Sequence, residues 1–406
     1  MTPHVIVNDL DLTDCEPFVR GEAHLLWRRL RQEAPVHWNP SPDGGFWALT
    51  KYEDVLAAYR DHETFSSAHG AILGGSYHSK VDTASNRMLV CADVPQHRSL
   101  RRRVQPVFSQ RMVARVSREV RRTVGAALDR FWADGGGDFA SEVAPELPAA
   151  ALVALMGIGH RDAHHLIGLT RRMIGYRDED FEGGIADEGL RLAAVQGEIF
   201  DFFLDLVAER RSAPGDDAVT LLLSPADGRE LDEDSLLFNL MNLAVGGNET
   251  TPHSASGGVL ALLETPGQWE RLRADAGTVG TTVEEILRWT STNAYVQRTV
   301  TRATTIRGTQ LAAGDSVTLW NASANRDEEQ FTDPDRFDVG RTPNRHLAFG
   351  SGPHHCIGAG TARTELTALV EELRSRPGRL EQAGEPVRLR SNFMLGIKSL
   401  PVRVVV

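Results

Sequence analysis

A single cysteine in a glycine-rich loop is the residue of this sequence best suited to chemistry. Residues 349–363 read FGSGPHHCIGAGTAR, so four glycines surround Cys356 and a helix-compatible run follows. Glycine allows the backbone to take positive φ and to approach a flat ligand closely. Backbone N–H groups in such a loop, together with the start of the following helix, favour a thiolate anion. The loop therefore points to a reactive or metal-binding sulfur.

Other kinds of site can also place a cysteine in such a loop. A buried structural cysteine is the commonest case in general. Zinc needs three or four ligands, and neither CxxC nor HxxxH lies beside Cys356. A phosphate loop would carry GK[ST], which this loop lacks. A single soft thiolate is best suited to an iron whose other four ligands come from a porphyrin.

The second unusual feature is a buried helix that contains the sequence AVGGNETTPHS at residues 244–254. Each glycine inside a helix costs about 1 kcal/mol relative to alanine. Pro252 has no N–H, so the carbonyl of Asn248 loses its partner. Glu249 and Thr250 place an acid and an alcohol at this weak point, where an opened helix could bind dioxygen or water. An ordinary helix end followed by a newly capped helix is the alternative.

The cysteine loop resembles the haem-binding signature of the cytochrome P450 family, F-G-x-G-x-[HR]-x-C-x-G-x-x-x-A. Every fixed position is filled, by Phe349, Gly350, Gly352, His354, Cys356, Gly358 and Ala362. The resemblance implies that Cys356 is the proximal iron ligand of haem b, iron protoporphyrin IX. It also implies that His354 contacts a haem propionate, that Phe349 lies against the thiolate side of the ring, and that Gly358 belongs to the cofactor-binding loop.

The interrupted helix resembles the oxygen-activation motif of the same family, [AG]-G-x-[DE]-T-[TS]. The matching residues are Gly246, Gly247, Asn248, Glu249, Thr250 and Thr251. The resemblance implies a catalytic set of Gly247, Glu249 and Thr250. Thr250 would hydrogen-bond the oxygen that is being activated, and Glu249 would help to relay protons to it. Asn248 stands where many relatives carry histidine, so it is expected to alter the pocket or the proton path.

The segment EEILRW, residues 284–289, contains Glu285 and Arg288 three positions apart on one helix face. Taken alone, this pair would be a surface ion pair worth less than about 0.5 kcal/mol. Its place before the cysteine loop resembles the ExxR pair of the family, which is structural and locks the core behind the haem. The third member of that cluster comes from the preceding coil, and Arg336 in PDRFD is the candidate.

Three basic residues are expected to bind the haem propionates. His97 and Arg101 in DVPQHRSLR resemble the H-x-x-x-R helix start of the family, and Arg298 in YVQRT matches its other propionate arginine. Cations suit carboxylates that would otherwise be costly to bury. The alternative for His97 and Arg101 is a solvated basic helix. The alternative for Arg298 is an exposed strand residue.

The elements that must position these motifs are mostly helices. Helical patterns cover residues 22–34, 97–131, 141–156, 186–212, 233–264 and 281–290, and another helix follows the cysteine loop. Strand patterns cover residues 35–51, as two short strands, 294–320 and the C-terminal PVRVVV, while 65–80 reads as a long loop. We find neither a repeat nor a linker. The expected fold is a single domain, residues 1–406, mainly α with small β-sheets, the triangular prism of the cytochrome P450 family.

The net charge and the cysteine content restrict the partners and the cellular location that we expect for the protein. The formal net charge of −11 argues against a general nucleic-acid binder. Nine arginines nevertheless lie within residues 98–122, where the family docks an acidic ferredoxin that is reduced by a separate ferredoxin reductase. The N-terminus resembles no signal peptide, and no uninterrupted apolar run predicts a membrane span. Three scattered cysteines do not form a disulfide framework, so a cytoplasmic location is expected.

The resemblance implies a haem-thiolate monooxygenase that uses O2 to hydroxylate or epoxidise an apolar small molecule. A secondary metabolite such as a polyketide, as in antibiotic biosynthesis, is the expected substrate. The 65–90 loop and the 165–190 segment should help to line the pocket. Its other expected residues are Ala244, Asn248, Asn293, Ala294, Tyr295, Val296, Phe393 and Met394. A peroxide-driven peroxygenase of the same fold and a non-catalytic haem-binding sensor are the alternatives.

Overall fold

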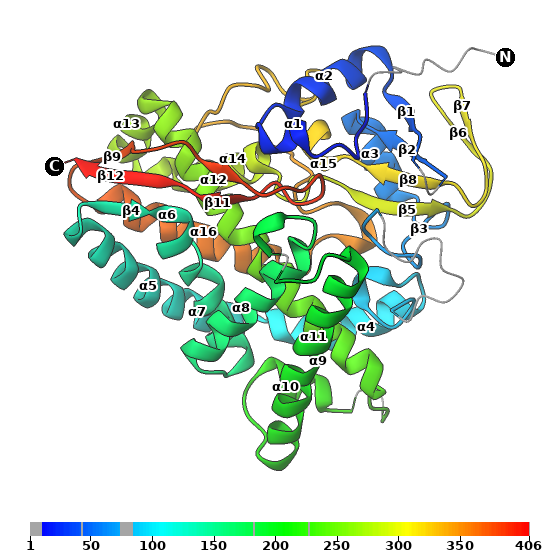
Figure 1. The fold of residues 1–406 in the computed structure, drawn as a ribbon, viewed down its shortest axis with the longest axis horizontal. Coiled ribbons are helices and arrows are strands. Elements are labelled where there is room, and N and C mark those ends of the chain that lie inside the picture. The colour runs from blue at the N-terminus through cyan, green and yellow to red at the C-terminus, as the bar shows by residue number, and fades with distance from the viewer. Residues whose placement is uncertain (1–9, 42–43, 74–83, 182, 226–227, 406) are drawn as a thin grey trace.

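The computed structural model describes residues 10–41, 44–73, 84–181, 183–225 and 228–405. Figure 1 shows a roughly triangular outline, with helices filling most of the molecule and small sheets at its two upper sides. The fold is therefore mainly α, as the sequence predicts.

The helices of eight or more residues give the molecule its bulk (Figure 1). In chain order they are α2 (Ala23–Glu33), α3 (Tyr52–Arg60), α4 (Gln96–Val104), α5 (Gln110–Ala133), α7 (Glu146–Met156), α8 (His160–Ile174), α9 (Glu188–Ser212), α11 (Glu233–Asn248), α12 (Thr250–Glu264), α13 (Pro266–Ala274), α14 (Val279–Thr290) and α16 (Ala359–Ser375). Shorter helices and turns are α1 (Glu16–Val19), η2 (Leu89–Cys91), η3 (Gln105–Phe108), α6 (Phe139–Glu142), η4 (Glu179–Phe181), α10 (Ala218–Leu223), η5 (Ala276–Thr278), α15 (Asn321–Ala324) and η6 (Gly352–His354).

The strands form small sheets. The largest has the order β1-β2-β8-β5-β3, in which only β2 and β8 are parallel. Its strands are β1 (Val36–Asn39), β2 (Phe46–Leu49), β8 (Ser316–Leu319), β5 (Val296–Val300) and β3 (Phe65–Ser66). The other sheets pair β4 (Gly136–Asp138), β12 (Pro401–Val405) and β9 (Arg379–Gln382), then β10 (Val387–Arg388) with β11 (Ile397–Ser399), and β6 (Thr304–Ile306) with β7 (Thr309–Leu311).

The helical core explains why these elements pack together. On α5, apolar residues recur every three or four positions from Met112 to Phe131, so one face of the helix is buried. That face contacts α7 and α16, and the same core cluster includes residues of α12 and α14. A second cluster joins α7, α8, α9, α10 and α11. Helix α12 thus belongs to the first cluster, α11 to the second, and α7 contributes to both.

Three helices of eight or more residues, α3, α8 and α13, were not predicted from the sequence. Helix α8 buries Ala163, Leu166, Ile167 and Leu169, which have helical spacing. Three histidines and Gly168 interrupt this apolar pattern, so the periodicity is weak when the sequence is read alone. The helices expected around residues 97–131, 141–156, 186–212 and 233–264 are present, with short breaks.

One stretch of the described chain, Phe139–Met156, is long and apolar enough to cross a membrane, with a mean hydropathy of 1.4. It includes Glu142 and Glu146, so it is not an uninterrupted apolar run. In the structure 78% of the stretch is buried, and its apolar residues belong to the helical core. The packing of the core therefore accounts for its composition.

Candidate active site

The cysteine loop lies between η6 and α16, close against the C-terminal end of α3. Gly350 and Gly352 both have positive φ, +64° and +68°. A Cβ on Gly352 would lie 2.5 Å from the carbonyl oxygen of Tyr59, so no larger residue fits there without displacing α3. The N–H of Cys356 donates to the carbonyl of Phe349 at 2.9 Å and closes the loop. The glycines thus allow the tight turn that presents the cysteine.

The sulfur of Cys356 faces a cavity and is surrounded by positive charge and N–H donors. Burial raises the pKa of Cys356, while the backbone N–H groups of Gly358 and Ala359 and the charges of Arg101 and Arg363 act to lower it. Donors aimed at sulfur stabilise a thiolate and reduce its basicity. Burial is the larger influence and the pKa of Cys356 is raised overall, so a bound metal would be needed to hold the sulfur as a thiolate, with these donors directed at it.

The cavity has a volume of about 360 Å³ and separates the cysteine loop from the interrupted helix. Its walls are mostly apolar, with Leu152, Leu155, Leu243 and Val245 among them. Binding cavities for small molecules typically combine apolar walls with a few polar groups. Here the polar groups include Cys356 on one side and Thr250 at the helix break on the other.

Four basic side chains meet at one edge of the cavity: His97, Arg101, Arg298 and His354 all line it. The rings of His97 and His354 are 4.1 Å apart between centroids. In the described part of the chain none of the four forms an ion pair, although Arg298 is only 5% exposed. Both ring nitrogens of His97 are buried without a hydrogen-bond partner.

The pKa values of the two histidines are both lowered, as expected where buried imidazoles lie beside cations. Burial, with the charge of Arg101, lowers the pKa of His97 to about 4. Burial, with the charge of Arg298, lowers the pKa of His354 to about 2. Buried cations and unpaired donors are costly unless an anion or acceptor joins them. A ligand with carboxylates at this edge and a metal near Cys356 fits the site, as haem does.

The helix break coincides with the acid and alcohol identified in the sequence. Helix α11 ends at Asn248 and α12 begins at Thr250, with Glu249 between them. Thr250 lines the cavity, and its hydroxyl donates to the carbonyl of Gly246 at 2.9 Å. A Cβ at Gly246 or at Gly247 would meet nothing within 4 Å, so the helix surface is bare beside the cavity. A small guest can therefore approach the backbone here.

Glu249 does not line the cavity, although the residue after it does. Its carboxylate lies 3.8 Å from the Nε of Arg171 and 3.4 Å from the Nε2 of His253. The Nδ1 of His253 accepts a hydrogen bond from the N–H of Ile397, so the ring proton is on Nε2 and faces Glu249. The other carboxylate oxygen of Glu249 is buried without a partner. The carboxylate of Glu249 thus lies outside the cavity lining, next to two basic groups, Arg171 and His253.

The structure reveals an acid that sequence reasoning missed. Glu365 on α16 lines the cavity, is 3% exposed, and has one carboxylate oxygen without a partner. Burial raises its pKa well above the usual range, and a hydrogen bond with Thr251 opposes this only in part. The signal was available, because Glu365 lies on the buried face that also carries Thr361 and Leu369.

The predicted pocket residues fall into two groups. Asn248, Asn293, Val296, Phe393 and Met394 line the cavity, whereas Ala244, Ala294 and Tyr295 do not. Their assignment to the pocket was wrong.

Packing explains this correction. Ala244 is fully buried among the helices. The Tyr295 ring contacts Trp320 and Phe393 at centroid distances of 4.8 and 5.4 Å, and its hydroxyl accepts from the N–H of Leu73. Of the predicted loops, Ala71, Ile72, Leu89 and Val90 line the cavity, as does Ile174; residues 74–83 lie outside the described part of the chain.

Behind the cysteine loop, Glu285 and Arg288 form a fully buried pair rather than a surface one. Two hydrogen bonds of 2.8 Å join them, and Arg288 also donates to the carbonyls of Asn325 and Pro334. The third side chain of the cluster is that of Arg341, whose Nε lies 3.1 Å from Glu285.

Arg336 was therefore the wrong choice for the third side chain, since it contributes only its backbone carbonyl to Arg288 and Arg341. Both arginines follow the same run of coil, and sequence spacing alone does not tell which side chain turns inward.

Phe349 lies between the residues behind the cysteine loop and the cavity. It lines the cavity, the guanidinium of Arg363 lies 4.7 Å from its ring centroid, and the ring of His346 is 6.0 Å away. Both Arg363 and His346 contact Glu284 on α14. Although burial acts in the opposite direction, these two contacts lower the pKa of Glu284 to about 2.

The arginine-rich stretch on α4 and α5 is less uniformly basic than the sequence suggests. Several of its members have acidic or carbonyl partners, as Arg111 does with Asp216 and Arg121 with Glu371. Arg98, Arg102 and Arg118 are exposed and have no ion pair within the described residues. Arg101 of the same stretch donates to the carbonyls of Pro353 and His355. The free arginines thus belong to the helices that contact the cysteine loop.

Known proteins are similar to this chain both in sequence and in fold. The model of the family described as Cytochrome P450 matches residues 189–375. A putative cytochrome P450 126 of Mycobacterium tuberculosis is 35% identical, over 100% of this chain and 99% of that protein. A methyl-branched lipid omega-hydroxylase of the same species is 36% identical, over 92% of this chain and 89% of that protein.

A solved structure confirms the expected fold class. The crystal structure of P450 OxyD, involved in the biosynthesis of vancomycin-type antibiotics, superimposes with a TM-score of 0.88 at 36% identity. The match covers 98% of this chain and 99% of that one. Because relatives named as hydroxylases and monooxygenases match along nearly the whole chain, the enzyme class is shown as well. The chain belongs to the cytochrome P450 family of haem-thiolate monooxygenases.

Proposed function

We propose that this cytochrome P450 hydroxylates or epoxidises an apolar secondary metabolite, with a polyketide scaffold as the leading candidate. The observation that carries the proposal is the mostly apolar cavity between Cys356 and Thr250. A cavity with a thiolate at one end and an alcohol at the other suits oxidation of a substrate that offers few polar groups. Residues 1–406 would act as one catalytic domain.

The thiolate side would hold haem b. Cys356 would bind the iron, while His97, Arg101, Arg298 and His354 would hold the two propionates. Haem held by a thiolate supplies the activation of O2 and the transfer of one oxygen atom to carbon. The unpaired nitrogens of His97 and the unpaired cation of Arg298 support this assignment, because each gains a partner when carboxylates arrive.

On the oxygen side, Thr250 would orient a small guest and pass protons to it. Its hydroxyl is bonded to the carbonyl of Gly246, and a modest rotation would redirect it into the space left by Gly247. Glu249 would supply protons from behind the helix. To do so it must leave Arg171 or His253, and this makes proton delivery a gated step.

Electrons would come from a separate ferredoxin and its reductase. Arg98, Arg102 and Arg118 offer unpaired positive charge on the helices next to the cysteine loop. An acidic partner would be steered to such a surface, and salt would weaken the encounter. A cytoplasmic location would give access to these partners.

The relatives support an apolar substrate class. OxyD is described in the biosynthesis of vancomycin-type antibiotics, and the mycobacterial relative is named for methyl-branched lipids. Asn293 offers one polar contact within the cavity, because its side-chain oxygen is buried there without a partner. A substrate with one hydroxyl or amide near an extended apolar skeleton would match this arrangement.

The first experiment tests the thiolate. The purified protein is reduced and exposed to carbon monoxide, and the expected result is the red-shifted Soret band that only thiolate-ligated ferrous haem gives. Cys356→Ala should abolish this band, while Cys15→Ala, at a buried cysteine that does not line the cavity, should keep it. A band of wild-type position and height in Cys356→Ala would contradict the assignment.

The second experiment identifies the substrate and the source of oxidant. Polyketides, terpenes, fatty acids and aromatic compounds are screened for the shift of the Soret band from low spin to high spin. Hits are then incubated with ¹⁸O2, ferredoxin, reductase and NAD(P)H, and ¹⁸O in the product is expected. Turnover with hydrogen peroxide alone would favour the peroxygenase alternative. Reduction of the haem without oxidation of any hit would favour the sensor.

A further inference from the structure

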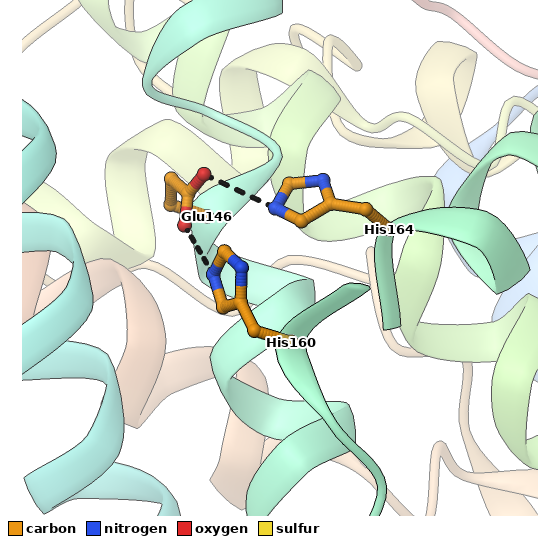
Figure 2. A group of neighbouring side chains, drawn as sticks. All are labelled: Glu146, His160 and His164. Atoms are coloured by element: carbon orange, nitrogen blue, oxygen red, sulfur yellow. Dashed lines mark hydrogen bonds and ion pairs between the residues drawn. The ribbon is translucent and has the colours of Figure 1, made fainter. Parts of the chain in front are cut away.

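A cluster of two histidines and one glutamate lies outside the active site. Figure 2 shows the carboxylate of Glu146, from the first turn of α7, facing the rings of His160 and His164, from the first turns of α8. One carboxylate oxygen is 2.9 Å from the Nε2 of His160, and the other is 3.1 Å from the Nε2 of His164. None of the three lines the cavity of the active site.

We propose that Glu146, His160 and His164 form a binding site for one divalent transition-metal ion of the Zn²⁺ class. The donor set is two imidazoles and one carboxylate, which Zn²⁺ accepts with a fourth position left for water. The two histidines are four residues apart on one helix, so their rings project from the same face. Their centroids are 4.6 Å apart.

The spacing of the ligand atoms is suitable for coordination. In a tetrahedral Zn²⁺ site, ligand atoms about 2.0 Å from the ion lie roughly 3.3 Å from one another. The three donor atoms lie within 4.8 Å of one another, and both carboxylate-to-imidazole distances are close to the ideal edge. Small side-chain rotations would bring the atoms around an ion.

Burial and charge also favour an ion. The side chain of Glu146 is 11% exposed, whereas those of His160 and His164 are 46% and 37% exposed. Burial raises the pKa of Glu146, but hydrogen bonds from both imidazoles outweigh this and the pKa is lowered. The carboxylate is therefore ionised at neutral pH, held in place by packing, and reached from solvent through the two histidines.

An ion at this position would restrain helix α8. The same helix carries Thr170, which accepts a hydrogen bond from Asn248, and Arg171, which faces Glu249. The ion would thus brace, from outside, the helix that touches the break beside the active site.

The test uses untagged, haem-loaded protein and Zn²⁺ in competition with a colorimetric zinc indicator at pH 7.5. One ion per chain is expected, together with a rise in Tm on addition of Zn²⁺. His160→Ala, His164→Ala and Glu146→Gln should each weaken binding at least tenfold. His165→Ala, an exposed neighbour on the same helix, should bind as the wild type does.

Two further measurements make the result decisive. The Soret spectrum and helical circular dichroism of every variant should match the wild type, which separates lost ligands from lost folding. An excess of EDTA should remove the ion and return the Tm to that of the metal-free protein. Two results would overturn the proposal. One is wild-type affinity in the doubly substituted His160→Ala, His164→Ala protein. The other is the absence of saturable binding at Zn²⁺ concentrations up to about 100 µM.

Discussion

The two sides of the cavity differ in how completely their buried carboxylates are paired. Behind the cysteine loop, on the thiolate side, Glu285 accepts from Arg288, Arg341, Asn344 and the N–H of Asp338. Both oxygens of this carboxylate are paired, and a buried carboxylate with so many donors is rigidly held.

On the oxygen side the pairing is incomplete. Glu249, Glu365 and Asn293 each leave one buried oxygen without a hydrogen-bond partner. Unpaired buried groups cost free energy, and they are tolerated where protons or guests must come and go. The contrast teaches that the support behind Cys356 is fixed, whereas the groups near the helix break are left adjustable.

The largest effect on stability is expected from a substitution in the Glu285 cluster on the thiolate side. Arg288→Ala removes five hydrogen bonds, two to Glu285 and three to backbone carbonyls, and leaves the buried charge of Glu285 with only Arg341 as an ionic partner. We expect a loss of about 3–5 kcal/mol in the free energy of unfolding, and little haem-loaded protein. Urea unfolding and the haem-to-protein absorbance ratio measure this.

The matched controls for that experiment lie in the same coil. Arg341→Ala should cost about 1–3 kcal/mol, since one charged hydrogen-bonding partner of Glu285 is lost. Arg336→Ala should change stability by less than about 0.5 kcal/mol, because only its backbone carbonyl takes part. If Arg336→Ala proved as damaging as Arg341→Ala, the described cluster would be wrong.

On the adjustable side, substitution should harm chemistry and spare the fold. Thr250→Ala removes the hydroxyl beside the bare glycines, so we expect product formed per NAD(P)H consumed to fall by about tenfold or more. Thr250→Ser keeps the hydroxyl and should retain most of the coupling. Product, oxygen consumption and peroxide release are measured together. Equal coupling in the alanine and serine variants would contradict a role for the hydroxyl.

A smaller effect is expected on the surface of the thiolate side. Arg102→Glu should raise the KM for an acidic ferredoxin several-fold at low salt, and 0.5 M salt should reduce the difference. Arg111→Glu is the comparison, because that arginine is already paired with Asp216 and contributes less free charge. Stopped-flow reduction at several salt concentrations gives the result. Identical salt dependence in both variants would argue against docking at Arg102.

The smallest effect concerns pH and the buried acid of the oxygen side. Burial raises the pKa of Glu365 in the folded protein, so folding favours its protonated form. The resulting stability is present below the pKa of the unfolded chain and is lost as pH rises toward the folded value. Glu365→Gln removes this loss, so its Tm should fall less than that of the wild type between pH 5 and pH 8. Parallel Tm curves would show that Glu365 is ionised throughout.

Sequence alone predicted the parts of this molecule whose chemistry demands particular residue types. The loop around Cys356 must turn tightly and aim N–H groups at sulfur, and these needs leave glycines at set positions. The break at Glu249 was visible for the same reason, because glycines and Pro252 weaken a helix wherever they occur.

Features that depend on side-chain direction were not predictable. Tyr295 is flanked by predicted pocket residues, yet its ring packs on Trp320 and is turned away from the cavity. The choice between Arg336 and Arg341 depends on how a coil bends, and coil bends follow no periodicity. Glu365 was overlooked because an acid on a helix is usually solvated, whereas this one faces inward.

The gathering of His97, Arg101, Arg298 and His354 should also make maturation of the protein depend on its prosthetic group. Before that group binds, the charges of Arg101 and Arg298 form no ion pair among the described residues, and the buried nitrogens of His97 have no partner there. This would make closure of the surrounding helices less favourable. Tetrapyrrole supply would then set the yield of native chains during biosynthesis. Under iron limitation, we expect a larger share of newly made polypeptide to be degraded by proteases.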